Sequence, residues 1–434
     1  MTFKRANVAA PPTILYLTNA LPVPNVSGGQ LREYELLRRL GPFFNIHLVA
    51  FAAGKLPEPR QIQQVLQFLT SVTYVRVDEV GANSVLSPRS RSCYAASGPQ
   101  ILRRLLTELQ PRLLHLEGFF LNQHLPPVLQ VPMVLAAENI EFELEDVRYG
   151  ASHPYALRTR HEELEAWARA DACVAVTDED RAVIAREQPR APVTCITDGW
   201  DHLTTQDLDL GSSAGADTTA LYVANYSWAP SRDAAHVLVT EIWPRVRAAC
   251  SSAKLVLAGI GMDAELAGLA RAQPGIEVHG PFDSFCELAR GASVFAFPMR
   301  FGGGIKVKLI EAAAAAMAVV TTTPALRGFA PELRQAVVVA NDYAQFADAI
   351  VALFSDQARV RELGLRAQRI VRSSLPTWDM AAAALASVWL RQMGFGASWP
   401  ANRERTPAIA DRKEYQQNTV RPLHNECASA SDGE

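Results

Sequence analysis

Short runs of apolar residues alternate with helical stretches along the first 200 residues. The runs are five to eight residues long, and several are apolar at consecutive rather than alternate positions. Helices are expected between them, for example at 30–40 and 99–108. Continuous apolar strands separated by helices are typical of a parallel sheet that is covered on both faces. We therefore predict strands at 13–19, 46–51, 72–77, 113–117, 131–138, 173–177 and 193–197.

The same alternation returns in the second half of the chain. It follows a segment at 203–219 that is rich in Gly, Ser, Thr and Asp, which predicts a linker. Helices are expected at 233–250, 305–316 and 380–393, and the polar tail at 395–434 is expected to be disordered. The strands predicted here are 220–225, 254–259, 276–280, 293–298, 318–322 and 336–340.

These elements predict an α/β protein with two Rossmann-like, doubly wound domains that face each other across a cleft. The N-terminal domain spans 1–202 and the C-terminal domain spans 220–394. Ligands of open α/β sheets bind outside the carboxyl ends of the strands. A ligand between two such edges is also well placed to be shielded from water when the domains close.

Composition and charge limit which ligands, partners and cellular locations we expect for the protein. The 434 residues include 42 Lys and Arg against 45 Asp and Glu, so the net charge is −3, which disfavours a nucleic-acid partner. Six single cysteines and no His cluster at zinc spacing predict a reducing compartment and no metal site. The longest apolar run has nine residues, whereas a membrane span needs about 20. No secretory pattern opens the chain, so we expect a cytoplasmic protein with at most peripheral membrane contact.

The segment 298–311, PMRFGGGIKVKLIE, is the strongest candidate for chemistry. A strand end is followed by three glycines and then by a helix. Glycines let backbone N–H groups approach a ligand, and a helix N-terminus adds free donors and a positive dipole end. The segment therefore predicts a diphosphate pocket, although a plain glycine-rich turn with solvated lysines would have the same sequence. The residues concerned are Gly302, Gly303, Gly304, Arg300, Lys306 and Lys308.

Two more features fit a nucleotide sugar. Glu311 lies two helical turns after the glycines, where its carboxylate can accept hydrogen bonds from the hydroxyls of a ribose or sugar ring. In the first domain, Gly28 and Gly29 follow the first strand and lead into a helix. This second loop is either an ordinary connection or an opposite wall that brings backbone amides to the same ligand.

Several segments together resemble one family. They are residues 14–40, 197–201 (TDGWD), 222–234, 259–262 and 297–312, with Trp378 ahead of the last helix. The chain resembles, over about 13–392, the GT-B glycosyltransferases of the large retaining family 4, in a sub-group with a GGG loop. The resemblance implies a nucleotide-diphosphate sugar in the C-terminal domain and an acceptor in the N-terminal one. It also implies retention of configuration without a metal or other cofactor, and a last helix that can pack back on the first domain.

The family pattern of two glutamates seven residues apart assigns roles on the donor side. Glu311 matches the second glutamate and would hold the nucleotide ribose, while Gly303 stands in the first position. The diphosphate would then be held, and its departure catalysed, by the basic residues already named. Backbone around Gly280 and Phe282 is expected to contact the base.

On the acceptor side, the chain departs from its relatives at two positions. Glu117 and Glu138 stand where relatives often carry His. We expect these two residues on the acceptor side, with a glycan, a lipid-linked sugar or a natural product as the acceptor, as in polysaccharide biosynthesis.

Other functions share parts of these patterns. A GT-B nucleotide-sugar epimerase and a non-catalytic nucleotide-sugar-binding partner would keep the same pocket. The G-x-G turn at Gly259 and Gly261 is a partial dinucleotide fingerprint, but it follows the second strand of its domain rather than the first. The D-x-D of Asp207 and Asp209 is best interpreted as a solvated acidic linker.

Overall fold

A computed structural model describes residues 11–24, 26–52, 57–81, 84–203, 218–282 and 284–395. The described residues of both predicted domains belong to one compact unit. Most of the predicted linker and of the predicted tail, namely 204–217 and 396–434, lies outside the described residues. We call residues up to 203 the first half and residues from 218 the second half.

The first half is built on a seven-stranded sheet. Its order is β3-β2-β1-β4-β5-β6-β7, and every pair is parallel. β4 and β5 are buried at every position, as expected for a sheet covered on both faces. The strands are β1 (Thr13–Thr18), β2 (Asn45–Ala52), β3 (Ser71–Arg76), β4 (Leu113–Glu117), β5 (Met133–Ala137), β6 (Ala172–Ala175) and β7 (Val193–Cys195).

Helices cover this sheet on both faces, and each face has its own apolar core. α1 begins at Gly28 because the Oγ of Ser27 accepts a hydrogen bond from the Gln30 amide at 3.1 Å. The helices of the first half are α1 (Gly28–Leu40), α2 (Pro59–Leu66), α3 (Pro88–Arg91), α4 (Gly98–Leu109), η1 (Phe119–His124), α5 (Glu141–Tyr149), α6 (Pro154–Arg169) and α7 (Asp178–Glu187).

The second half repeats this plan with six parallel strands in the order β10-β9-β8-β11-β12-β13. All thirteen predicted strands are therefore present, and the predicted α/β class is confirmed. The strands are β8 (Thr219–Asn225), β9 (Lys254–Ile260), β10 (Ile276–Val278), β11 (Val294–Phe297), β12 (Ala318–Thr321) and β13 (Val338–Val339).

Two helices of the second half differ in their bounds from the prediction. The helix expected at 233–250 begins at Ala229, with Pro230 in its first turn, and runs through a π turn to Ala249. The helix expected at 305–316 is shorter, because Lys306 is extended and Ala316 is left-handed. The helices are α8 (Ala229–Val237), η3 (Leu238–Ile242), α9 (Trp243–Ala249), α10 (Ala264–Ala272), α11 (Phe285–Arg290), α12 (Val307–Ala314), η4 (Thr323–Leu326), η5 (Pro331–Gln335), α13 (Tyr343–Phe354) and α14 (Gln357–Ser374).

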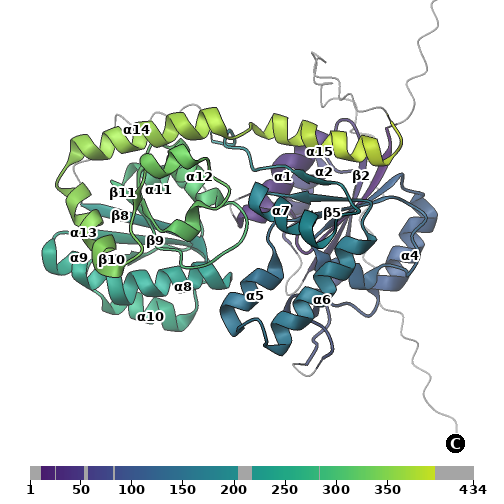
Figure 1. The fold of residues 1–434 in the computed structure, drawn as a ribbon, viewed down its shortest axis with the longest axis horizontal. Helices are drawn as coiled ribbons and strands as arrows, with labels where there is room; N and C mark the ends of the chain where they lie inside the picture. Colours follow the sequence, from purple (N-terminus) through teal and green to yellow (C-terminus); the bar gives the residue numbers. More distant parts are fainter. Residues whose placement is uncertain are drawn as a thin grey trace, which may run out of the picture. The chain divides into compact units, whose positions relative to one another are not determined.

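The last described helix, α15 (Trp378–Gln392), follows the second half in sequence but packs on the first. It lies beside α1, and Figure 1 shows it in yellow-green over β2 and β5. Trp378 and Trp389 are both fully buried there, within the core that β1 and α1 share.

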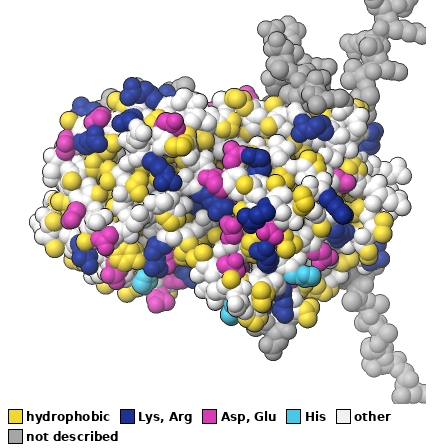
Figure 2. Space-filling view, viewed as in Figure 1, with side chains coloured by type: hydrophobic (Ala, Val, Ile, Leu, Met, Phe, Trp, Pro, Cys, Tyr) yellow, Lys and Arg dark blue, Asp and Glu magenta, His cyan; other side chains and the backbone are white. Residues whose placement is uncertain are grey.

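Both sheets reverse their strand order in the same way, between β1 and β4 and between β8 and β11. The carboxyl ends at such switch points are where open α/β sheets bind ligands. On the face shown in Figure 2, acidic and basic side chains are interspersed. Within the described residues, every helix is too short or too polar to cross a membrane.

Candidate active site

A cavity of about 560 Å³ lies at the carboxyl ends of both sheets. Its walls come from both halves, and the volume suits a nucleotide-sized ligand. Three helices begin at it: α1 at Gly28, α8 at Ala229–Arg232 and α12 at Val307. Free N–H groups and the positive dipole ends of these helices therefore face the cavity, which favours an anion.

The glycine triplet lies at the junction of the two halves, but its members have different surroundings. Gly303 lines the cavity, and the amide of Asn139 donates to its carbonyl at 3.0 Å in the orientation that satisfies both groups. Gly304 has a φ of +60° and packs so closely on the first half that a Cβ would lie 2.2 Å from the Glu138 carbonyl oxygen. The loop therefore needs glycine at 304 for both conformation and close packing.

Gly302 is surrounded by side chains of the second half. Its φ is +149°, and a Cβ there would approach the side chains of Met299, Lys306 and Trp228 rather than backbone of the first half. It is not among the residues that line the cavity.

Lys306 holds this loop from within. Its ammonium donates to the carbonyls of Gly303 and Gly304, both at 2.7 Å, and the side chain is buried. Burial lowers the pKa of Lys306 to about 7, although the nearby Asp180 carboxylate opposes that change. Lys306 borders the cavity, but its hydrogen bonds go to the loop.

Lys308 presents its ammonium at the cavity and pairs with Glu311 one turn later. Its Nζ lies 2.7 Å from Glu311 Oε2 and 5.4 Å from the centre of the Phe282 ring. Glu311 is buried and lies behind Lys308, outside the cavity lining. Burial by itself would raise the pKa of Glu311, but Lys308 and His202 outweigh that effect and hold the pKa at about 2.

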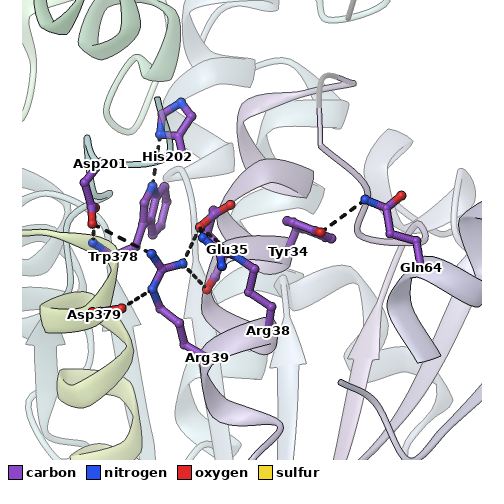
Figure 3. A network of polar contacts seen from close by, with 9 residues as sticks. All are labelled: Tyr34, Glu35, Arg38, Arg39, Gln64, Asp201, His202, Trp378 and Asp379. Atoms are coloured by element: carbon purple, nitrogen blue, oxygen red, sulfur yellow. Dashed lines mark hydrogen bonds and ion pairs between the residues drawn. The ribbon is translucent and has the colours of Figure 1, made fainter. Parts of the chain in front are cut away.

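His202, which sequence analysis did not single out, is a second partner of Glu311. The indole N–H of Trp378 donates to His202 Nδ1 at 3.1 Å, as Figure 3 shows. Because Nδ1 accepts, the ring proton lies on Nε2, which donates to Glu311 Oε1 at 3.1 Å. This chain of hydrogen bonds joins α15 to α12, where Lys308 lines the cavity.

Arg39 fixes the same connection from α1, as Figure 3 shows. Its guanidinium pairs with Glu35 and lies 2.5 Å from Asp379 and 3.8 Å from Asp201. Asp201 in turn accepts the backbone N–H of Trp378 at 2.6 Å. The segment after β7 is thus held between α1 and α15, which positions His202.

Arg300 lies away from the cavity. Its Nε donates to Asp233 of α8 at 2.8 Å, its Nη1 donates to the Tyr343 hydroxyl at 3.1 Å, and about half of its side chain is exposed. The structure therefore does not bring Arg300 together with Lys306 and Lys308 at the cavity wall.

On the opposite wall, Gly28 and Gly29 both line the cavity at the start of α1. A Cβ on Gly28 would meet the Val307 side chain at 3.0 Å, and one on Gly29 would lie 2.4 Å from the Glu138 carboxylate. The two predicted glycine loops therefore approach each other across the cavity, with Glu138 between them.

Beneath this wall lies a set of buried charges. Arg32 of α1 pairs with Asp198, and both side chains are almost inaccessible. Glu117 is buried at the end of β4, with its Oε2 3.6 Å from His115 Nε2. Burial, with a further contribution from Glu117, raises the pKa of Glu138 to about 8.

Of the two residues expected to contact the nucleobase, one lines the cavity and the other does not. Phe282 lines the cavity. Gly280 is exposed and outside the lining, and its carbonyl accepts from the Gly259 amide at 3.2 Å. Gly259 itself lines the cavity and needs to be glycine, because a Cβ would lie 1.8 Å from the Ala224 carbonyl oxygen.

Comparison with known proteins agrees with this geometry. Residues 217–356 match the family model described as glycosyl transferases group 1. No curated protein sequence matches the chain.

Solved structures match over nearly their whole length. HepE from Anabaena, in complex with UDP and glucose, is 13% identical with a TM-score of 0.63, covering 86% of this chain and 98% of its own. Sucrose-phosphate synthase from Thermosynechococcus elongatus is 14% identical with a TM-score of 0.65, covering 89% and 100%. WaaG, a glycosyltransferase involved in lipopolysaccharide biosynthesis, is 12% identical with a TM-score of 0.62, covering 86% and 99%.

These matches confirm the predicted fold and the predicted enzyme class. The two parallel sheets, the shared cavity and the family match to the second half point in the same direction. The chain is therefore a glycosyltransferase-type enzyme with the GT-B fold, and it carries a group 1 glycosyltransferase domain at residues 217–356.

Proposed function

We propose that the protein transfers a sugar from a nucleotide-diphosphate sugar to an acceptor, with retention of the anomeric configuration. The observation that carries the proposal is the cavity wall formed by Lys308 and the first turns of α8 and α12. These groups favour a diphosphate, and the loop after β1 closes the opposite side. The acceptor, a glycan, a lipid-linked sugar or a natural product, would enter on the side of Glu117 and Glu138.

Departure of the diphosphate is the difficult step, because negative charge develops on its oxygens. The Lys308 ammonium and the helix N-termini are already oriented and need no rearrangement to stabilise that charge. Removing one preorganised donor of this kind can raise a reaction barrier by about 3 kcal/mol. The acceptor hydroxyl would then attack from the face that the diphosphate leaves.

The other residues predicted for the site would have different roles. Lys306 holds the carbonyls of the glycine loop, which keeps Gly303 at the cavity wall. Glu311 would reach a ribose only if Lys308 shifted, and otherwise acts by positioning Lys308. Arg300 would position α8 through Asp233. We propose that the reaction uses no cofactor beyond the nucleotide sugar.

The test is an assay of nucleotide release with UDP- and GDP-sugars, with and without an acceptor pool of glycans and lipid-linked sugars. We expect release only when an acceptor is present and, in the product, the anomeric configuration of the donor by NMR. Lys308→Met should abolish most of the turnover, whereas Lys254→Met, an exposed lysine at the other end of β9, should keep it. Nucleotide release without an acceptor, or donor binding without turnover, would favour an epimerase or a binding partner instead.

A further inference from the structure

A small chamber of about 40 Å³ lies beside the main cavity in the first half. Glu33, Glu138 and Asn139 line both spaces, so the chamber borders the side where an acceptor would enter. Its other walls include Glu117, at the end of β4, and Trp167 of α6. Its volume is that of a single functional group rather than of a whole sugar.

Several buried polar atoms around this chamber make no hydrogen bond within the protein. Glu33 Oε2, Glu117 Oε2 and Glu138 Oε1 are buried and make no hydrogen bond. The indole N–H of Trp167, a donor from a different element, is also buried and unpaired. Arg89 Nε, on the same wall, is also buried without a hydrogen-bond partner. Five such atoms around one chamber indicate a ligand that contacts them.

Nearby positive groups do not balance these carboxylates. Arg32 is already paired with Asp198. His115 accepts the Trp389 indole N–H on Nδ1 at 3.1 Å, and its Nε2 lies 3.6 Å from Glu117 Oε2, beyond hydrogen-bond distance. Arg89 also lines the chamber, but it is one cation beside three glutamates, and its guanidinium lies over the Phe120 ring at 4.5 Å.

The two remaining acids of the chamber wall, Glu163 and Glu141, do not add to these unpaired atoms. Glu163 accepts the backbone N–H groups of Glu141 and Phe142 at 3.1 and 3.0 Å. The Glu141 side chain is only partly buried, so its carboxylate is within reach of solvent. The acids with a buried, unpaired carboxylate oxygen are therefore Glu33, Glu117 and Glu138.

We propose that this chamber binds a primary ammonium group of the acceptor, so that the acceptor is an amino sugar or another amine-bearing compound. An ammonium has three N–H donors and no acceptor, which matches the three free carboxylate oxygens. A hydroxyl can also donate to a carboxylate, but it carries no charge that would stabilise the three glutamates in their ionised form. The inference deepens the proposed function, because it names the acceptor class.

Proton linkage follows from the same groups. Burial raises the pKa of Glu33 well above its usual range and that of Glu138 to about 8, and Glu117 adds to both. The facing groups are Tyr16, Arg32, Arg89, His115 and Asp198. An ammonium favours the ionised carboxylates, so its binding at pH 7 should displace protons from the chamber.

The test is calorimetric titration of the full chain, without donor, using D-glucosamine, N-acetyl-D-glucosamine and D-glucose as probes. Measurements at pH 7 in two buffers of different ionisation enthalpy give the number of protons released. We expect glucosamine to bind at least tenfold more tightly than the other two sugars and to release protons. Glu33→Gln and Glu117→Gln should each weaken glucosamine tenfold or more, whereas Glu165→Gln, exposed on α6, should not.

Separate readouts keep this inference apart from the proposed function. Circular dichroism shows whether each variant is folded, and UDP and GDP titrations test the donor cavity independently. Equal affinity for the three sugars, no glucosamine binding, or binding without proton release would overturn the ammonium site, even if a nucleotide binds. Selective glucosamine binding without nucleotide binding would support the chamber and count against the donor site.

Discussion

Replacing Glu311 by Gln tests the buried pairings on the donor side of the cavity. Glu311 is held by Lys308 and His202, and its pKa is about 2 instead of 4.5. A depressed pKa means that the folded state prefers the ionised carboxylate, and the difference corresponds to about 3 kcal/mol of stability at neutral pH. The Glu311→Gln variant should lose about that amount, since glutamine cannot pair with Lys308 as a charge.

The dependence on pH follows from the sign of this shift. The contribution of Glu311 is fully present above about pH 4.5 and disappears as the pH falls towards 2. The assay is urea unfolding of wild type and variant at pH 7, 5, 4 and 3, compared with Glu332→Gln, an exposed glutamate of η5. Wild type and Glu311→Gln should converge as the pH falls. A stability difference that is the same at pH 3 and pH 7, or absent at pH 7, would refute the reasoning.

Three further predictions concern the glycine loop and its lysines. Lys308→Met should lower kcat by about a hundredfold in a transferase assay, with Lys254→Met unaffected, and normal turnover would remove Lys308 from the diphosphate site. Gly303→Ala should raise the donor KM, because its Cβ would lie 2.9 Å from Asn139 Cβ and must displace that side chain; unchanged donor kinetics would argue against the contact. Because the pKa of Lys306 is lowered to about 7, wild-type stability should rise between pH 7 and 10, and Lys306→Met should lack that rise in urea unfolding.

The strands could be predicted because a parallel sheet leaves a clear pattern in the sequence. Buried strands such as β5 and β11 are apolar at every position. The ends of α12 could not be predicted in the same way. Lys306 leaves the helix to bind two loop carbonyls, which is a tertiary contact that local preferences do not contain.

The sequence predicted which loops form the candidate site better than it predicted how the side chains pair there. Gly28, Gly29, Gly303 and Lys308 all line the cavity, because strand ends of parallel sheets meet at one edge. Partners far apart in sequence were missed. His202 bonds a residue 109 positions away, and no spacing rule connects them.

Arg300 shows the converse limit. It follows β11 next to the glycines, so its position in the sequence suggested the diphosphate pocket. The side chain instead points to Asp233, which lies on another helix of the same half. Sequence position determines where the backbone of a loop lies. The partner of a long side chain depends on all the residues that surround it in the fold, including those far away in sequence.

The central claim is that Lys308 and the neighbouring helix ends grip the diphosphate of the donor. Calorimetric titration of UDP, GDP and their parent nucleosides into wild type and Lys308→Met tests it most directly. We expect the preferred nucleoside diphosphate to lose at least tenfold in affinity in the variant, while the parent nucleoside binds as before. Wild-type affinity of the variant for that diphosphate would contradict a diphosphate site at Lys308.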